Sequence, residues 1–271
     1  MKKKIKVGII GGGTIGSALA QAVVTTLKAD AQLRFLCEKH KEKAAALQKK
    51  YRVHARLVSL IELVRRSDLI IEAASPKVAA QVIKLACKWN KKVLIMSVGG
   101  LLQPQVTELF KKNRVRIFCP SGAITGVDGV LAAANGRIRK VRLITRKPPE
   151  ALMGAAYFLK KKFPTLKKFS EERRIFCGTA AEAIENFPQN INVAAVLSLA
   201  GIGPERTRVE IWTSLAYKGN RHEILVEGDF GTFTTVTQNR PAPGNPKTSY
   251  LAILSAIATL KKAFASVRVG T

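Results

Sequence analysis

A strand-like apolar run that leads directly into closely spaced glycines places the strongest constraint on the fold of this chain. Residues 6–10 read Lys-Val-Gly-Ile-Ile, and Gly11, Gly13 and Gly16 follow before a segment of small, helix-favouring residues. An apolar strand, a glycine turn and a helix, in this order, form the dinucleotide-binding fingerprint. Gly11 permits a tight turn, Gly13 lets backbone N–H groups approach a pyrophosphate, and Gly16 lets the helix lie close to the strand. The segment therefore predicts a nucleotide cofactor.

A carboxylate stands at the position that such a cofactor needs. The strand-like segment Leu33–Cys37 ends at Glu38, about 20 residues after Gly16, where an acid commonly holds the ribose 2′-hydroxyl. Glu38 should repel a 2′-phosphate and so favour NAD, whereas the basic residues 39–41 directly after it could tolerate NADP. We expect NAD, with NADP as the alternative.

Apolar strands and helices continue to alternate through the first part of the chain. This alternation is typical of a doubly wound parallel sheet, and we expect a Rossmann domain over residues 1–120. Ligands of such sheets lie outside the carboxyl ends of the strands. The residues expected there to bind the cofactor are Gly11, Gly13, Thr14, Ile15, Gly16, Glu38, Lys39, Ala74, Ser75 and Gly99.

The pattern changes beyond Pro120. A predicted helix at Ile124–Asn135 is followed by further helices and then by consecutive strand-like segments, at Arg208–Thr213, Glu223–Glu227 and Thr232–Gln238. Helices grouped with consecutive strands indicate a smaller α+β domain with a mostly antiparallel sheet, over residues 121–245. The final element, Tyr250–Phe264, reads as an amphipathic helix within residues 246–271, and the Asn245-Pro246 pair before it reads as its cap and first turn.

The composition is strongly basic, with 46 Lys and Arg against 18 Asp and Glu and a net charge of +28. Such an excess often indicates a nucleic-acid partner. Here the basic residues are dispersed, only 6% of residues are aromatic, and no nucleic-acid motif is visible. We expect a solvated basic surface with weak polyanion binding at low salt and no specific nucleic-acid partner. The same field would favour anionic cofactors and substrates.

Two further features narrow the class of protein. No apolar run reaches the roughly 18 residues that a membrane span needs, and the start lacks the pattern of a secretory signal, so we expect a cytoplasmic protein without membrane contact. The four cysteines are far apart and show no metal-ligand spacing, so no metal site is expected.

Few residues offer catalytic chemistry. There are three histidines, and His222 lies at the entry to a strand of the second domain. A single histidine at a strand edge is usually a surface or structural group when judged from the sequence pattern alone. A G-x-S-x-G motif is absent, so a hydrolase of that type is not indicated.

Several segments nevertheless resemble those of the L-aspartate dehydrogenase family, and they fall in order along nearly the whole chain. They are Gly11–Gly16, Glu72–Ser75, Pro120–Ile124, Thr145–Pro149, Phe187–Ala195, His222–Gly231 and Asn245–Ala252. The most specific are the His222 strand and the Asn-Pro-Lys-Thr-Ser-Tyr run. One departure is Thr125, where a second glycine is expected.

The resemblance implies an NAD(P)-dependent oxidoreductase that deaminates L-aspartate to iminoaspartate, or to oxaloacetate and ammonia, or runs in reverse. It implies that His222 is catalytic, that Ala123 and Asn192 touch the cofactor, and that the final helix packs on the first domain. In that family the iminoaspartate can feed the biosynthesis of the pyridine nucleotide NAD.

A dicarboxylate substrate needs cations or N–H groups as partners. Lys247 and Thr248, at the predicted start of the final helix, could supply them beside the positive helix terminus. Ser121 and Gly122, with Ala123, could offer backbone N–H groups. A neutral His222 near the ordinary pKa of about 6.5 could accept the ammonium proton or activate water.

Two alternatives stay open. One is a related reductase of the homoserine or dihydrodipicolinate type, although the His-His motif of the latter is absent. The other is a non-catalytic, polyanion-binding protein, suggested by the net charge of +28. A homodimer is expected because sheets of such catalytic domains often pair across two-fold axes.

Overall fold

The computed structural model describes residues 3–113, 115–153, 157, 171–187 and 192–270. These form two compact units. The first contains the chain up to Pro120 together with Ile253–Arg268, and the second contains Ser121–Ala252 and the residues from Val269 onward.

The first unit is built on a parallel sheet of six strands in the order β3-β2-β1-β4-β5-β6. The strands are β1 (Ile5–Ile10), β2 (Ala31–Cys37), β3 (Arg56–Leu57), β4 (Leu69–Glu72), β5 (Lys92–Ile95) and β6 (Ile117–Phe118). The strand order reverses between β1 and β4, which is the switch point of a doubly wound sheet. The predicted Rossmann fold is confirmed.

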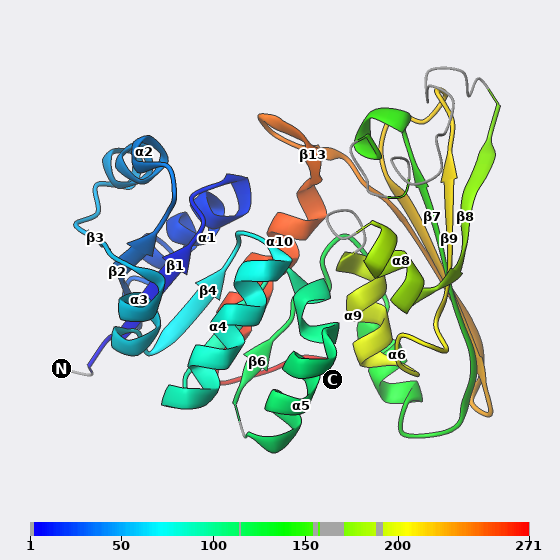
Figure 1. Ribbon diagram of the computed structural model, residues 1–271, viewed down its shortest axis with the longest axis horizontal. Coiled ribbons are helices and arrows are strands. Elements are labelled where there is room, and N and C mark those ends of the chain that lie inside the picture. Colours follow the sequence, from blue (N-terminus) through cyan, green and yellow to red (C-terminus); the bar gives the residue numbers. More distant parts are fainter. Residues whose placement is uncertain (1–2, 114, 154–156, 158–170, 188–191, 271) are drawn as a thin grey trace. The chain divides into compact units, whose positions relative to one another are not determined.

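Helices connect these strands (Figure 1). They are α1 (Thr14–Val24), α2 (Lys41–Tyr51), α3 (Leu60–Arg66), α4 (Pro76–Trp89), the 3₁₀ helix η1 (Val98–Leu102) and α5 (Pro104–Lys112). Helix α10 (Tyr250–Lys262) also belongs to this unit, because its Ala256 and Leu260 are buried in the same hydrophobic core as β1 and β4.

The last helix begins at Tyr250, as predicted, but the prediction that Asn245 and Pro246 form its cap and first turn is wrong. Asn245–Ser249 form strand β13, which pairs with β12 (Pro241–Ala242) and directly precedes the helix. The Asn245 side chain does accept a hydrogen bond from the Lys247 N–H, at 3.1 Å, as a cap would. That local bond equally suits an extended turn, and the backbone pairing with β12 decides the outcome.

The second unit contains a five-stranded sheet in the order β11-β10-β7-β9-β8. Its strands are β7 (Ile138–Lys147), β8 (Arg173–Thr179), β9 (Arg208–Thr213), β10 (Arg221–Gly228) and β11 (Gly231–Gln238). Every neighbouring pair is antiparallel except β7 with β9. The mostly antiparallel α+β architecture expected from the sequence is therefore confirmed.

Three helices cover one face of this sheet, as Figure 1 shows: α6 (Val127–Ala133), α8 (Ala180–Asn186) and α9 (Asn192–Ala200). A short 3₁₀ helix, η2 (Pro149–Ala151), follows β7. Helix α6 is shorter than the predicted Ile124–Asn135. Gly126 has a φ of +80°, a left-handed conformation that delays the helix until Val127.

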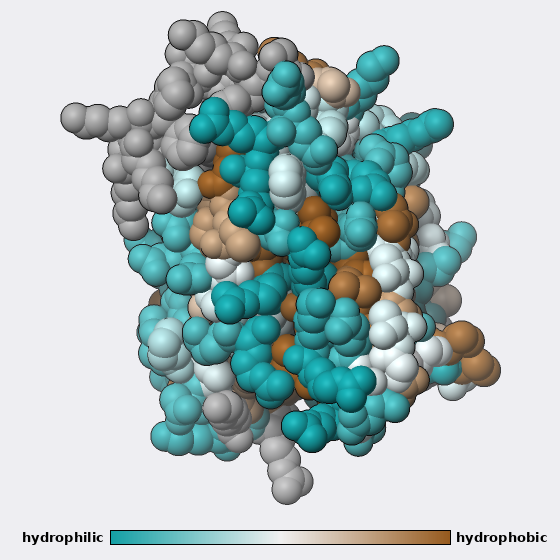
Figure 2. Space-filling view, turned by 90° about the vertical axis from the view of Figure 1, so that its right-hand side faces the viewer, coloured by the Kyte–Doolittle hydropathy of each residue, from teal (hydrophilic) through white to brown (hydrophobic). Residues whose placement is uncertain are grey.

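The two faces of the second sheet differ sharply in chemistry. Alternate residues of β7 and β10 are buried, and the residues between them are partly exposed. The exposed face carries charged residues interspersed with isolated hydrophobic ones, and Figure 2 shows this mixture on the side turned toward the viewer. Among the described helices, none has the length and apolar character needed to cross a membrane.

Candidate active site

The glycine turn of the first unit is shaped by close backbone contacts. Gly11 has a φ of +92°, and a Cβ atom there would lie 2.5 Å from the Ala73 carbonyl oxygen. A Cβ at Gly16 would lie 1.9 Å from the Gly11 carbonyl oxygen, so only glycine lets α1 approach β1 this closely. A Cβ at Gly13, in contrast, would meet no described atom within 4 Å.

Helix α1 starts directly after this open position. Gly13 is its N-cap and supplies no side-chain hydrogen bond, and the first turn contains no acidic residue. The first N–H groups of a helix have no partner within the helix and lie at the positive end of its dipole. The turn therefore fits the pyrophosphate of a dinucleotide.

Glu38 is fixed at the end of β2. Its Oε2 atom accepts a hydrogen bond from the Gly12 N–H at 2.5 Å, and Oε1 accepts one from the His40 N–H at 3.0 Å. Partial burial raises the pKa of this carboxyl, but the backbone N–H donors and nearby Lys43 outweigh it and hold the pKa below the usual range. Glu38 is thus a preorganised anion next to the glycine turn.

A second carboxylate lies deeper in the same edge. Glu72 is fully buried at the end of β4 and accepts hydrogen bonds from the backbone N–H groups of Ala74, Ser75 and Ser97 and from the Ser97 hydroxyl, at 2.8–3.0 Å. Burial raises its pKa against the effect of these donors. Glu72 therefore holds together the loops that follow β4 and β5.

The topology brings the predicted cofactor residues of the first unit to one edge. They follow β1, β2, β4 and β5, which are adjacent parallel strands with their carboxyl ends on the same side. Ala74 and Lys39 are exposed there, and Ser75 caps α4 by accepting from the Val78 N–H at 3.4 Å. Gly99 is buried within η1, in the loop that follows β5.

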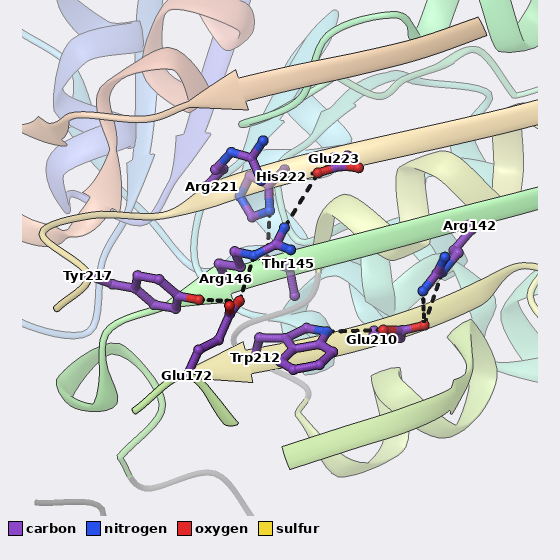
Figure 3. Close-up of polar contacts among 10 residues, drawn as sticks. All are labelled: Arg142, Thr145, Arg146, Glu172, Glu210, Trp212, Tyr217, Arg221, His222 and Glu223. Atoms are coloured by element: carbon purple, nitrogen blue, oxygen red, sulfur yellow. Dashed lines mark hydrogen bonds and ion pairs between the residues drawn. The ribbon is translucent and has the colours of Figure 1, made fainter. Parts of the chain in front are cut away.

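In the second unit, His222 lies on the buried, helix-covered face of the sheet and is only 2% exposed. Its Nδ1 atom lies 2.8 Å from Oγ1 of Thr145 on the neighbouring strand β7 (Figure 3). Burial, and then the charge of Lys147, lower the pKa of His222 to about 3. The imidazole is therefore neutral across the physiological range, in contrast to the ordinary pKa expected from the sequence.

Lys147 lies two residues beyond Thr145 on the same buried face of β7 and is 7% exposed. Burial lowers the pKa of its amine to about 8. The register shows how close it is to the histidine: Thr145 pairs with His222, and Arg146 pairs with Arg221. Diagonal neighbours on one face of a sheet are roughly 7–8 Å apart at the backbone, within the reach of a long side chain.

The loop at residues 121–125 is tied to the same end of the sheet. Asn239, just after β11, donates from Nδ2 to the Ala123 carbonyl oxygen at 2.9 Å. The hydroxyl oxygens of Thr125 and Thr237 lie 3.1 Å apart, and Thr237 pairs with His222. The loop that contains Ser121, Gly122 and Ala123 therefore lies near the histidine.

Asn239 also carries an unsatisfied buried atom. Its side chain is 5% exposed, and Oδ1 has no hydrogen-bond partner among the described residues. The bond from Nδ2 to Ala123 fixes the orientation of the amide. A buried acceptor without a donor is costly in a folded protein, so this oxygen is open to a donor from an ordered water or a ligand.

A cavity of about 350 Å³ adjoins this end of the second unit. Its lining includes Lys218, Asn239, Arg240, Lys247 and Thr248. The predicted substrate residues Lys247 and Thr248 thus belong to a pocket wall in β13 and not to a helix terminus. The three cationic residues of this lining outnumber its one acid, Glu150, and suit an anionic ligand.

The outer face of the same sheet carries ion pairs instead (Figure 3). Arg142 donates to Glu210 at 2.6 and 3.0 Å, and the Trp212 indole N–H donates to the same carboxylate at 3.0 Å. Arg146 contacts Glu172 at 2.8 Å. The Arg142–Glu210 pair joins β7 to β9, and the Arg146–Glu172 pair ties β7 to the residue before β8, so these groups are structural in character.

Asn192, the remaining predicted cofactor residue, is the first residue of α9 in the second unit and is partly buried. Part of the Phe187–Ala195 segment, at positions 188–191, lies outside the described residues. Within the described residues, no group of His, Cys, Asp and Glu is arranged to hold a metal.

Three residues of the cluster did not emerge from the sequence: Thr145, Lys147 and Asn239. The first two lie in a segment that resembles the family, but no role followed from it. The available signal was the alternation Val141, Leu143, Thr145, Lys147, in which a lysine takes an inward position of a strand.

Comparison with known proteins identifies the family of this chain. Residues 128–263 match the family model described as aspartate dehydrogenase, C-terminal, and residues 11–120 match the NAD-binding domain model of homoserine dehydrogenase. The L-aspartate dehydrogenase of Methanosarcina mazei is 43% identical over 272 residues, which cover 98% of this chain and 100% of the relative. The chain belongs to the L-aspartate dehydrogenase family.

The same family appears in other organisms and among solved structures. L-aspartate dehydrogenase 3 of Bordetella bronchiseptica is 35% identical, with 100% of this chain and 99% of the relative covered. The crystal structure of aspartate dehydrogenase from Thermotoga maritima has the same fold, with a TM-score of 0.76, 21% identity and coverage of 99% and 100%. The predicted family and the prediction of an enzyme are confirmed. The match to homoserine dehydrogenase covers only the NAD-binding domain, residues 11–120.

Proposed function

We propose that this protein catalyses the NAD-dependent oxidative deamination of L-aspartate to iminoaspartate, which hydrolyses to oxaloacetate and ammonia. The observation that carries the proposal is the buried Thr145–His222 pair beside a lysine and an orphaned amide oxygen, in a chain of this family. This cluster offers a proton acceptor, a hydrogen-bond acceptor and an orienting imidazole in one place. A deamination that must remove an ammonium proton can use each of these groups.

A nicotinamide cofactor would supply the hydride acceptor. We assign its pyrophosphate to the turn that contains Gly11, Gly13 and Gly16, with Thr14 and Ile15 in the first helical turn. Its adenine ribose is assigned to Glu38, beside Lys39. Ala74, Ser75 and Gly99, and from the second unit Ala123 and Asn192, are proposed as the remaining contacts.

NAD is the proposed cofactor because Glu38 is held as an anion, and an anion repels a 2′-phosphate. Three basic residues close to it, Lys39, Lys41 and Lys43, would lower the penalty for NADP. We therefore propose NAD as the preferred cofactor and NADP as a poorer one.

The two carboxylates of aspartate are assigned to the basic pocket of the second unit. Lys247 and Thr248 line it together with Arg240. The loop at Ser121 and Gly122 would add backbone N–H groups, since Asn239 ties this loop to the same end of the sheet. Replacing Lys247 by Ala should raise the KM for aspartate and leave cofactor affinity unchanged.

His222 is assigned an orienting role. With a pKa of about 3, it stays neutral at physiological pH and cannot store the proton of an ammonium group. Thr145 fixes one ring nitrogen, and the other is available to orient the reacting amine or the water that attacks the iminium carbon.

The decisive experiment follows absorbance at 340 nm with each of several amino acids and each cofactor. We expect a rise with L-aspartate and NAD, and a fall with oxaloacetate, ammonia and NADH. The His222→Ala variant should bind NADH normally and lose turnover. A flat trace combined with tight, salt-sensitive DNA binding would instead support the polyanion-binding alternative.

A homodimer remains our expectation for the assembly, and the mixed outer face of the second sheet is the candidate surface. Its Val236 is 51% exposed in a strand otherwise rich in threonine. Sedimentation equilibrium decides the oligomeric state. A supply of iminoaspartate to NAD biosynthesis is proposed on family grounds, and measuring both directions of the reaction tests whether the deaminating direction is feasible.

A further inference from the structure

The buried face of the second sheet ends in two rows of polar residues. The first row is Thr145, His222 and Thr237, which pair across β7, β10 and β11. The second row follows two residues further along these strands and contains Lys147 and Asn239. The Asn239 N–H donates to the Asn220 carbonyl oxygen at 2.8 Å, which continues the pairing of β10 and β11 beyond the first row.

Lys147 and Asn239 lie on the same face at the same end of the sheet. Residues two apart on a strand point to the same face, so both side chains share the face of His222. Asn239 ends in a buried oxygen that lacks a donor. An ammonium group could donate a hydrogen bond to this oxygen, and the substrate proposed above carries an ammonium group.

We propose that Lys147 accepts the proton of the substrate's α-ammonium group, with Asn239 Oδ1 holding that group in place. The proposal rests on the proposed function. His222 then remains the neutral group that orients the reacting atoms. Lys147 is thereby a catalytic residue and Asn239 a substrate-binding residue.

The step balances. The lone pair of the neutral Lys147 Nζ takes one proton from the α-ammonium group, which leaves a neutral α-amine. The nitrogen lone pair forms the C=N bond as hydride leaves Cα for the nicotinamide, so the substrate loses two electrons and the cofactor gains them. The product is the protonated imine of aspartate, and Lys147 returns its proton to solvent.

The surroundings of Lys147 suit this role. Burial lowers its pKa to about 8, near the pH at which such a base works best. The titratable group that faces it from β10 is His222, which stays neutral. In the described part of the chain, Arg146 pairs with Glu172, and Glu210 pairs with Arg142, on the outer face of the sheet. Helix α9 has no ionisable residue, and the acids of α6, α8 and η2 are exposed.

The test compares Lys147→Met and Lys147→Arg with a matched control, Lys140→Met. Lys140 lies on the same strand and pairs with Glu227 at 3.0 Å on the surface. In the wild type, kcat/KM for aspartate should rise with pH to a plateau, with an apparent pKa near 8. In both Lys147 variants, kcat/KM for aspartate should fall about 100-fold or more and should no longer rise with pH around pH 8. The control should match the wild type.

The arginine variant separates proton transfer from charge. Arginine keeps the positive charge and does not release its proton near neutral pH. Recovery of activity in Lys147→Arg would therefore show a carboxylate-binding role and overturn the proposal. A rise of kcat/KM with pH that persists in Lys147→Met would overturn it too. For Asn239, Asn239→Ala should raise the KM for aspartate at unchanged NADH affinity, and an unchanged KM would remove Asn239 from the proposal.

A second readout does not depend on turnover. In protein labelled with ¹³C at the lysine ε-carbon, one signal should titrate near pH 8 and be absent in Lys147→Met. Absence of such a signal from the wild type would contradict the proposal. Failure of the proposed function is distinguishable, because the wild type would then show no aspartate-dependent NADH formation while the titrating signal remained.

Discussion

Nδ1 of His222 lies 2.8 Å from Oγ1 of Thr145, between two strands whose residues are 77 positions apart in the chain. The two side chains occupy directly paired positions of β10 and β7. Because the hydrogen bond at Nδ1 fixes which tautomer the ring adopts, Thr145 determines whether the other nitrogen, Nε2, donates or accepts. The orientation of the imidazole is therefore a property of the pair.

Replacing Thr145 by Val keeps the shape of the side chain and removes this bond. Loss of one neutral hydrogen bond, about 1 to 1.5 kcal/mol, should lower kcat about tenfold, with little change in NADH affinity. Thr145→Ser, which keeps the hydroxyl, is the matched control and should retain most of the activity. Equal kcat values for the two variants would show that the hydroxyl does not orient the ring.

The glycine turn permits a test that separates folding from cofactor binding. Gly13→Ala places a methyl group where no described atom lies within 4 Å, so the melting temperature should be unchanged. The methyl would obstruct the approach of the pyrophosphate, and the Kd for NADH should rise about tenfold or more, equivalent to about 1.4 kcal/mol.

Gly16→Ala should instead reduce the stability of the fold. Its methyl would lie 1.9 Å from the Gly11 carbonyl oxygen, and the strain should reduce stability by roughly 1–3 kcal/mol. Urea unfolding and NADH fluorescence titration of both variants measure the two effects. Normal NADH affinity in Gly13→Ala would place the pyrophosphate elsewhere.

Glu38 should control the choice between the two cofactors. Glu38→Gln keeps an oxygen that can accept from the backbone N–H groups but removes the charge that repels a 2′-phosphate. The ratio of kcat/KM for NAD to that for NADP should fall about tenfold, which corresponds to about 1.4 kcal/mol. Glu42→Gln removes a nearby but exposed charge and is the matched control. The same ratio in both variants would argue against ribose recognition by Glu38.

Parts of this molecule follow from short-range sequence signals and parts do not. The β1 strand, Gly11 and α1 are adjacent in the chain, so residue order alone predicts how they fold. The position of His222 opposite Thr145 depends on the register of β10 against β7, which no local pattern specifies. The burial that lowers the pKa of His222 was equally invisible, and the sequence therefore suggested an ordinary basic imidazole.

The cap predicted for the last helix shows a different limit. Asn245 followed by Pro246 suits a helix cap as well as an extended turn, and the same side chain bond to the Lys247 N–H occurs in the turn. The choice is made by pairing of β13 with β12, a contact that forms only in the folded chain. Lys247 thus reaches the proposed substrate pocket by a route that helix signals did not predict.

The depressed pKa of His222 has a consequence for stability. The unfolded chain binds a proton at this residue below about pH 6.5, whereas the folded protein does so only near pH 3. Between these values the unfolded state holds more protons, so the free energy of unfolding should fall as the pH is lowered, by at most about 1.4 kcal/mol per pH unit from this group. Above pH 6.5 the effect is absent.

The His222→Gln variant removes this titration while keeping a polar side chain. Urea unfolding of both proteins at pH 7 and pH 4.5 should show that the wild type loses more stability on acidification than the variant does. Carboxylates titrate in both proteins, so the difference between the two losses isolates the imidazole. Equal losses would mean that His222 is protonated in the folded state at pH 4.5, and the neutral, orienting role assigned to it would then fail.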